Sequence, residues 1–172
     1  MSLDAIKRKI ISEKSLKLLR DKYKDKKIVF TSGSFDVIHT GHIIYLNKCK
    51  ELGDVLVVGL GRNSVIKKLK GKDRPINPEN NRILLIAALQ DVDYVLFNKE
   101  TPETIESAEL DYIESVSLLR PDIFCINSDN NFLDLNRREV ERLGAKFTIM
   151  NRDLPEDITP NSTTNILKKL KL

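Results

Sequence analysis

The chain has 172 residues, of which 41% are hydrophobic and 31% are charged. This balance is typical of a soluble globular protein with a sizeable core, and it excludes a disordered chain. The net charge of +4 suits phosphate-bearing ligands or a plain solvated surface. Only 6% of the residues are aromatic and none is tryptophan, so we expect no nucleic-acid partner, because base-stacking platforms need aromatic side chains.

The compartment is predicted from the cysteines and from the apolar runs. Cys49 and Cys125 lie in apolar segments and lack the spacing of a zinc site, so we expect two small buried residues in a reducing environment. Residues 1–15 hold no apolar signal segment, and no later run is long enough to span a membrane. We therefore expect a cytoplasmic protein with no membrane partner.

Helix-like and strand-like segments alternate along the chain. In chain order, the predicted elements are a helix over 12–23, a strand over 27–32, helices over 40–52 and 63–70 with a strand over 54–60 between them, a helix over 78–90, a strand over 93–97, a helix from 101 that breaks before 111–120, a strand over 122–126, a helix around 136–143, a strand over 145–150 and a helix over 162–172. Ser12, Asn77 and Ser162 are the predicted N-caps, and Pro78 is the predicted first residue of its helix.

Strands that are apolar throughout and alternate with helices indicate a parallel sheet covered on both faces. We therefore predict an α/β fold with a Rossmann-like open sheet, mainly of five parallel strands, and helices on both faces. Residues 1–172 are expected to form a single domain, with a lead-in helix in 1–25 and the core in 26–172.

Polar residues and glycine follow every predicted strand, in "GSFDVIHTGH", "GRNS", "NKET", "NSDNN" and "NRDLPEDITPNSTT". In an open parallel sheet, ligands bind where the carboxyl ends of the strands meet. The pattern therefore predicts one polar site at that edge of the sheet.

The only two histidines, His39 and His42, both lie in the first of these segments. Gly33 and Gly41 allow close backbone approach, and a helix that begins near residue 40 offers free N–H groups to an anion. Both imidazoles are then placed to contact the same phosphate and to stabilise charge in a transition state. There is no P-loop and no G-x-G-x-x-G sequence, so neither of those phosphate-binding designs applies.

Three alternatives remain for this turn. A metal site needs a third ligand, which only carboxylates can supply here, because no third histidine exists. Nucleophilic catalysis by Ser34 is a second alternative, although the surrounding residues are not a G-x-S-x-G elbow. Histidines that only cap a turn are the third.

The stretch "GSFDVIHTGH" resembles the signature of nucleotidyltransferases with an H-x-G-H motif, in particular the cytidylyltransferase-like group. The stretches "LKGKDRPINPENNRILLIAALQDVDYVLF", "RPDIF" and "STTNILKKL" are similar, in order and spacing, to the adenylyltransferase domain of bacterial ADP-heptose synthesis. The resemblance extends over almost the whole chain. It implies an enzyme that transfers a nucleoside monophosphate, most simply AMP from ATP, to a sugar 1-phosphate such as heptose 1-phosphate, with release of pyrophosphate.

The resemblance also implies roles for individual residues. The catalytic residues would be His39, His42, Lys70 and Ser162; the nucleotide-binding residues Gly33, Ser34, Phe35, Gly41, Asp129 and Thr163; the phosphate-binding or sugar-phosphate-binding residues Arg74 and Arg82; and Mg²⁺ would accompany the triphosphate, with Asp36 as a candidate ligand. It further implies a homodimer. Each role has a structural alternative: surface charge for Lys70 and Arg74, capping for Asp36 and Ser162, and an ion pair with Glu79 or Asp91 for Arg82.

Two loops depart from the family pattern. Where the heptose enzymes have a "VKGGDY"-like stretch, this chain has "CINSDNN", so that Ile126, Asn127, Ser128 and Asn130 replace the lysine, two glycines and tyrosine, and only Asp129 is retained. Asn63 replaces an acid in "GRNS". In the family, these loops help to form the pockets for the nucleotide base and for the acceptor. The departures therefore affect which nucleotide and which acceptor are expected, more than the class of reaction. The alternatives are a cytidylyltransferase for glycerol 3-phosphate or a similar alcohol phosphate, an adenylyltransferase for flavin mononucleotide, or a nucleotide-binding relative without turnover.

Overall fold

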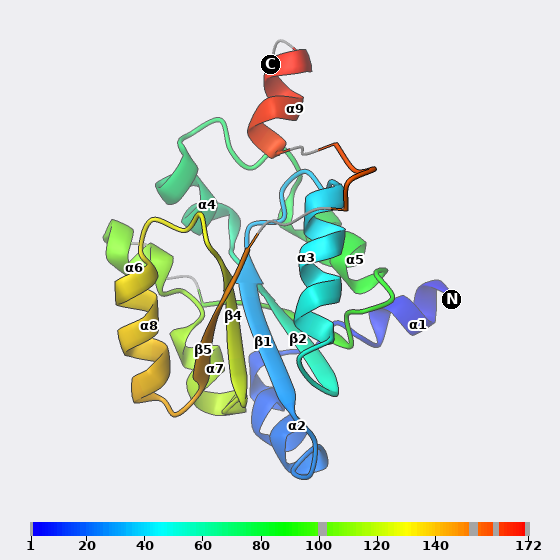
Figure 1. Cartoon of the computed structure of the whole chain (residues 1–172), viewed down its shortest axis with the longest axis vertical. Coiled ribbons are helices and arrows are strands. Elements are labelled where there is room, and N and C mark those ends of the chain that lie inside the picture. The colour runs from blue at the N-terminus through cyan, green and yellow to red at the C-terminus, as the bar shows by residue number, and fades with distance from the viewer. Residues whose placement is uncertain (1, 100–102, 152–154, 160–161, 171–172) are drawn as a thin grey trace.

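The computed structural model describes residues 2–99, 103–151, 155–159 and 162–170. Its centre is a sheet in which every neighbouring pair of strands is parallel, in the order β3-β2-β1-β4-β5 (Figure 1). The strands are β1 (Ile28–Gly33), β2 (Val55–Leu60), β3 (Tyr94–Phe97), β4 (Ile123–Asn127) and β5 (Lys146–Met150). The predicted Rossmann-like open sheet of five parallel strands is confirmed.

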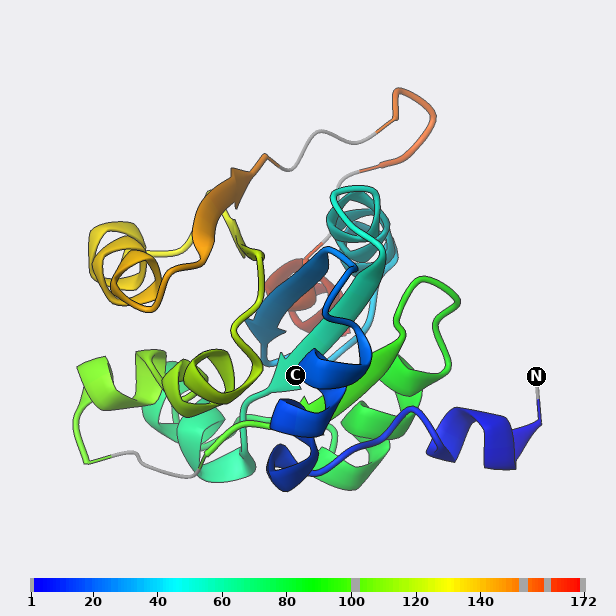
Figure 2. The same ribbon diagram turned by 90° about the horizontal axis from the view of Figure 1, so that it is seen from below.

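Helices cover both faces of this sheet (Figure 2). The described helices are α1 (Leu3–Lys7), a 3₁₀ turn (Glu13–Ser15), α2 (Leu16–Lys22), α3 (Thr40–Lys50), α4 (Asn63–Lys70), α5 (Glu79–Ala87), α6 (Ile105–Glu109), α7 (Ile113–Leu119), α8 (Leu133–Arg142) and α9 (Thr163–Leu170). Alternate residues of a strand point to opposite faces. In β1, Phe30 packs with α2, α7 and α8, whereas Val29 packs with α3 and α5 on the other face.

The predicted helix over 12–23 is divided in the structure into a 3₁₀ turn and α2. Ser12 is the N-cap of the turn, but its hydroxyl lies 3.1 Å from the hydroxyl of Ser15 and makes no capping bond to the backbone. Pro78 is the N-cap of α5 and not its first helical residue, which corrects the prediction that Asn77 would be the cap. The predicted helix start at residues 101 and 102 lies outside the described residues.

The N-terminal segment protects one edge of the sheet. After α1, Ile11 N–H donates to the carbonyl of Val95 (2.9 Å), and Val95 N–H donates to the carbonyl of Lys9 (2.9 Å). Val95 belongs to β3, the edge strand, so this parallel bridge satisfies backbone groups that would otherwise be exposed. Sequence reasoning missed α1, because five residues are too few for a helical period to be recognised.

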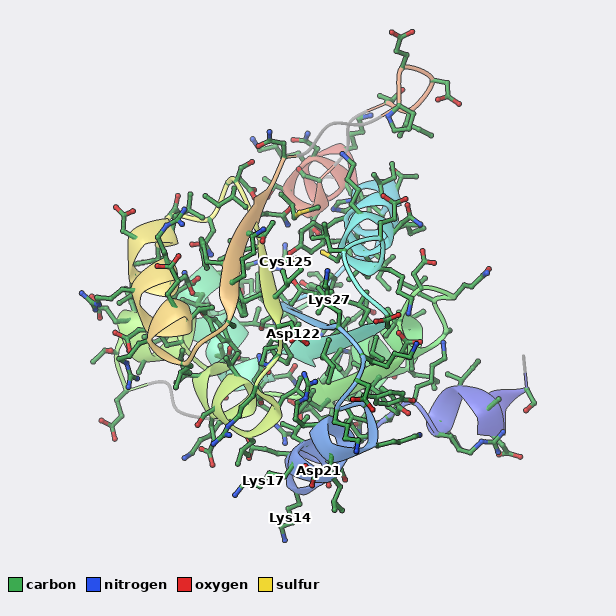
Figure 3. The ribbon with its side chains drawn as sticks, turned by 60° about the horizontal axis from the view of Figure 1, so that its bottom comes forward. Lys14, Lys17, Asp21, Lys27, Asp122 and Cys125 are labelled. Atoms are coloured by element: carbon green, nitrogen blue, oxygen red, sulfur yellow. The ribbon has the colours of Figure 1, made fainter. Side chains whose placement is uncertain are left out.

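Aspartates at the amino edge of the sheet hold neighbouring strands in register. Each aspartate precedes one strand and accepts a hydrogen bond from a main-chain N–H at or just before the start of a strand that neighbours it in the sheet. These carboxylates belong to Asp54, Asp93 and Asp122, which accept from Lys27 (2.8 Å), Leu56 (2.7 Å) and Ile28 (2.7 Å). Figure 3 labels Lys27 and Asp122 at this edge, with Lys14, Lys17 and Asp21 on the solvent side near α2. The three aspartates of this edge are therefore structural.

Cys49 of α3 and Cys125 of β4 are both fully buried and unoxidised, as predicted. Contact with Cys125 and burial raise the pKa of the Cys49 thiol, so it stays protonated at neutral pH. Among the described residues, no helix is both long enough and apolar enough to cross a bilayer.

Gly59, near the end of β2, has no room for a side chain. A Cβ at this position would lie 2.8 Å from Cζ of Phe30 and closer still to the side-chain oxygen of Asn98, and both residues are buried. We expect Gly59→Ala to lower the free energy of unfolding by about 1–3 kcal/mol, measured by urea denaturation.

Gly144 provides the comparison, because a Cβ there meets nothing within 4 Å and only its positive φ of 88° opposes a side chain. Gly144→Ala should cost about 1 kcal/mol through backbone strain alone. If Gly59→Ala has the same free energy of unfolding as the wild type, the packing described for this strand is contradicted.

Candidate active site

A cavity of about 360 Å³ opens at the carboxyl edge of the sheet, as the polar loops predicted. It receives residues from both faces: His42 and Tyr45 come from α3, whereas Tyr112 and Phe124 belong to the opposite core. In Figure 1, α4 and α9 lie at this end of the sheet, away from α2. The predicted site residues that line the cavity are Gly33, Ser34, Phe35, His42, Lys70 and Asp129.

The two histidines stack on each other at the start of α3. Their ring centroids are 3.9 Å apart and their planes differ by 27°. His39 is the N-cap residue, and its main-chain carbonyl accepts from the N–H of His42 (2.9 Å). The spacing of the H-x-G-H motif thus puts one imidazole just before the helix and the other in its first turn. Both lie at the positive end of the helix dipole, where an anion is favoured.

Phe35 explains why residue 33 is glycine. The backbone of Phe35 has a positive φ of 42°, which is uncommon for a residue with a side chain. Its buried ring lies 5.2 Å from the ring of His42, and a Cβ on Gly33 would meet this ring at 2.9 Å. The glycine therefore makes room for the aromatic ring that supports His42.

The structure does not bring Arg82 to the lining of the cavity. Its side chain is fully buried and points between the loops that follow β1 and β2. The guanidinium donates to the carbonyls of Ser34 (2.7 Å), Gly61 (2.9 Å) and Asn77 (3.1 Å), and to Oδ1 of Asn63 (3.0 Å). Arg82 is thus a positioning residue of these loops, in contrast to the predicted contact with phosphate.

The expected alternative for Arg82, an ion pair with Glu79 or Asp91, is also absent from its described contacts. Glu79 pairs instead with Arg62 (3.3 Å) and accepts from the N–H of Asn63 (3.1 Å). Asn63, which replaces an acid of the family pattern, therefore has a defined role, because its side chain accepts from Arg82 and its backbone donates to Glu79.

Asp36 anchors the loop between α4 and α5. Its buried carboxylate pairs with Arg74 (2.7 Å) and accepts from the N–H groups of Ile76 (3.0 Å) and Asn77 (2.8 Å). In the part of the chain that the structure describes, no three His, Cys, Asp or Glu side chains gather as a metal site. The contacts of Asp36 match the turn-capping alternative more closely than the role of a metal ligand.

Lys70 is the last residue of α4 and contributes a cation to the cavity lining. Loss of water around the ammonium lowers the pKa of Lys70, and the charge of Arg74 lowers it further. The carboxylates of Asp36, Asp129 and Glu109 act in the opposite direction. Lys70 therefore lies in a group of charges at the mouth of the cavity.

The start of α9 contacts the loop that leads into α3. The hydroxyl of Ser162 accepts from the N–H of Asn165 (3.2 Å), so the predicted N-cap is confirmed. Thr163 Oγ1 donates to the carbonyl of Val37 (3.3 Å). The bond from Thr163 holds α9 beside the histidine turn, although neither Ser162 nor Thr163 is among the residues that line the cavity.

Sequence reasoning missed the acidic residues that α6 and its connection to α7 add to the cavity. Asp111 and Glu109 both line it, and Asp111 is only 5% exposed. Asn98, which directly follows β3, donates to Oδ1 of Asp111 (2.9 Å) and to the hydroxyl of Ser32 (2.7 Å). The only signal in the sequence was an aspartate between apolar residues of a helical pattern.

The altered loop after β4 is built around Glu109. Asn130, which replaces the family tyrosine, donates to Oε1 of Glu109 (2.6 Å), and Asn136 of α8 donates to the same oxygen (3.1 Å). Tyr112 donates to Oδ1 of Asn136. Asn130 thus belongs to a hydrogen-bonded network between α6, α8 and the loop.

The amino-acid sequence is similar to that of a known protein family. The model of the cytidylyltransferase-like family matches residues 30–171. The bifunctional protein HldE of Helicobacter hepaticus is 40% identical over 167 residues, which are 96% of this chain and 31% of that protein. HldE of Campylobacter jejuni subsp. doylei is 47% identical over 123 residues, or 71% of this chain and 24% of that protein. The chain thus spans about a quarter to a third of these curated relatives.

Solved structures agree with the family match. A lipopolysaccharide core biosynthesis protein from Thermoplasma volcanium superimposes with a TM-score of 0.61 at 31% identity, covering 76% of this chain and 99% of that one. A pantoate-beta-alanine ligase from Francisella tularensis has a TM-score of 0.60 at 19% identity, covering 86% of this chain and 68% of that one. At this lower identity, the second structure shows a shared fold alone.

Replacing the buried guanidinium of Arg82 should destabilise the protein. Lysine has a single charged centre and cannot serve four acceptors that lie around a planar fork. We expect Arg82→Lys to lower the free energy of unfolding by about 2–4 kcal/mol, measured by urea denaturation. Arg138→Lys, at an exposed ion pair, should change it by less than about 1 kcal/mol. Equal stability of the two variants would contradict the positioning role.

Proposed function

The chain belongs to the cytidylyltransferase-like family of nucleotidyltransferases, and from this premise we propose that it transfers AMP from ATP to a sugar 1-phosphate. Heptose 1-phosphate is the leading acceptor. Support comes from the sequence resemblance to the adenylyltransferase domain of ADP-heptose synthesis and from the relatives named above. The observation that carries the proposal is the stacked pair of His39 and His42 at the start of α3, of which His42 lines the cavity.

The reaction is an in-line displacement at the α-phosphorus of ATP. An oxygen of the sugar phosphate forms a new bond to this phosphorus, the bond to the β-phosphate oxygen breaks, and pyrophosphate leaves. No covalent bond to the protein is formed, so the chain contributes position and charge stabilisation. His39 and His42 donate hydrogen bonds to phosphate oxygens, and these bonds strengthen as negative charge develops.

The other residues of the lining contact different parts of the substrates. Lys70 neutralises phosphate charge at the mouth of the cavity, and the backbone of Gly33, Ser34 and Phe35 borders the nucleotide. Asp129 lies after β4, where a hydroxyl of the nucleotide can donate to it. Arg74 remains a proposed phosphate ligand, although its present contact is the ion pair with Asp36.

Magnesium fits this site as a companion of the triphosphate and not as a resident of a protein cage. Mg²⁺ keeps several waters and binds mainly to substrate phosphates, so few protein ligands are needed. Its chemistry would be to neutralise charge on the phosphates. A homodimer and a cytoplasmic location remain predictions for the chain.

Loss of either imidazole should abolish most of the activity. We expect His42→Ala and His39→Ala to lower kcat for pyrophosphate release by about 100-fold or more, because each removes a donor that acts on the transition state. The measurement uses ATP, CTP, GTP and UTP with heptose 1-phosphate, glycerol 3-phosphate and flavin mononucleotide as acceptors.

Asn47→Ala is the control on the same helix, since Asn47 is exposed and bonds Asp91 outside the cavity. An unchanged rate in both histidine variants would refute the proposed site. Turnover only with CTP and glycerol 3-phosphate would replace the sugar-phosphate assignment with the cytidylyltransferase alternative.

Neutralising Lys70 should weaken phosphate binding selectively. We expect Lys70→Gln to lower kcat/KM by about 10- to 100-fold, the range for a lost hydrogen bond to a charged group. Lys68→Gln, on the same helix α4 but not among the residues that line the cavity, should leave kcat/KM within twofold. Equal effects of the two substitutions would mean that only general positive charge matters.

A further inference from the structure

The cavity has a second chemical pole opposite the histidines. His42 enters it from α3, on one face of the sheet, whereas Asp111 enters it from the connection between α6 and α7, on the other face. The first pole offers N–H groups and a helix N-terminus, which suit phosphate. The second pole offers carboxylate oxygens, which repel phosphate and accept hydrogen bonds from hydroxyl groups.

Asp111 is a buried carboxyl group with an incomplete set of protein partners. Oδ1 accepts from Asn98 (2.9 Å), but Oδ2 accepts no hydrogen bond from any residue that the structure describes. None of the described ion pairs includes Asp111. A 95%-buried carboxylate with no cation beside it is costly for the fold unless it serves another purpose.

The surroundings hold Asp111 in a fixed position. Asn98 is 1% exposed and bridges Asp111 to the hydroxyl of Ser32 at the end of β1. On the other side, a Cβ at Gly61 would lie 3.3 Å from Oδ2, so the glycine keeps the space beside this oxygen open. Three strand ends thus place one free acceptor atom at the border of the cavity.

The network around Glu109 closes this pole from the other side. α6 packs against α4, and Glu109 is tied to Asn130 and Asn136. Glu109 is half-buried and its Oε1 is tied to two amides of the fold, whereas Asp111 is buried and receives a single amide hydrogen bond at Oδ1. Asp111 is therefore the more desolvated member of the acidic pair, and the one that gains more from a ligand that donates a hydrogen bond.

We propose that Oδ2 of Asp111 accepts a hydrogen bond from a ring or side-chain hydroxyl of the acceptor sugar and selects polyhydroxylated acceptors over simple alcohol phosphates. This inference rests on the proposed function, because it assigns the acceptor end of that site. A sugar 1-phosphate that reaches the histidines with its phosphate extends its hydroxyls toward the opposite pole. An acceptor that lacks the hydroxyl leaves the buried oxygen without a partner, which is how a polar site rejects a smaller analogue.

The pKa of Asp111 agrees with this geometry. Burial raises the pKa of the Asp111 carboxyl well above its usual range, the hydrogen bond from Asn98 opposes this in part, and the charge of Glu109 adds to it. A carboxyl group whose pKa is raised by folding stabilises the protein most at low pH, and that stability is lost as the pH rises toward the folded-state pKa. Asp111 therefore lowers stability at neutral pH, as expected of a residue retained for binding.

The test is Asp111→Asn, which keeps the shape and can still accept from Asn98 but turns an N–H₂ group toward the cavity. With heptose 1-phosphate and ATP, we expect kcat/KM for the acceptor to fall about 10- to 100-fold, the range for a hydrogen bond lost in a buried site, while KM for ATP stays within twofold. Glu114→Gln is the matched control, because Glu114 is exposed, pairs with Lys99 and lies outside the cavity lining.

A series of monodeoxy analogues of heptose 1-phosphate identifies the hydroxyl. In the wild type, one analogue should be about 10-fold or more poorer than the parent sugar, and in Asp111→Asn that penalty should disappear. The wild-type series tests the inference even if the variant fails to fold. Equal use of every analogue by the wild type, or the same penalty in the variant, overturns it.

Thermal unfolding separates a binding role from a structural one. Asp111→Asn should unfold at a higher temperature than the wild type at pH 8, with a smaller gain at pH 5. A variant that is less stable at both pH values and that loses ATP and acceptor together would show a structural residue and overturn the inference.

A different result would contradict the proposed function itself: the wild type would release no pyrophosphate with any acceptor. In that case, calorimetric binding of heptose 1-phosphate to the wild type and to Asp111→Asn still decides the role of Asp111. Equal affinity, or no binding by either protein, overturns it.

Discussion

The buried guanidinium of Arg82 is the interaction on which the site depends. It lies between the loops that follow β1 and β2 and satisfies three main-chain carbonyls and one amide oxygen. Two loops cannot pack this closely while their buried carbonyl oxygens lack hydrogen bonds, so one donor group must reach every one of these oxygens. A single planar cation therefore fixes the residues before the histidine turn relative to the start of α4, which carries Lys70 at its far end.

Charged and polar groups have different roles at the two edges of the sheet. At the amino edge, three aspartates cap the first N–H groups of neighbouring strands and are bound up in the fold. At the carboxyl edge, cations and N–H groups gather near α3 and α4, and carboxylates gather at α6 and its connection to α7. This separation gives the cavity a phosphate end and a hydroxyl end, which matches a substrate with both groups.

Much of the fold was readable because parallel strands buried on both faces leave continuous apolar runs, such as "DVLVVGL" around β2. The histidine turn was readable because both imidazoles are close in sequence and precede a helix. The partners of Arg82 could not be predicted, because Ser34, Gly61 and Asn77 are far from it in sequence and contribute carbonyls that every residue has. Asp111 was missed for a related reason, since its burial depends on strand ends that only the folded chain brings together.

By itself, the sequence determined the parallel α/β sheet, the polar carboxyl edge and the histidine pair, because apolar periodicity and local helix signals are properties of short segments. Only the tertiary structure decided which charged groups face the cavity. It placed Arg82 and Asp36 in buried loop contacts and brought Asp111 and Glu109 to the cavity. The physical reason is that a charged side chain gains its role from desolvation and from partners distant in sequence, and both exist only once the strands have assembled.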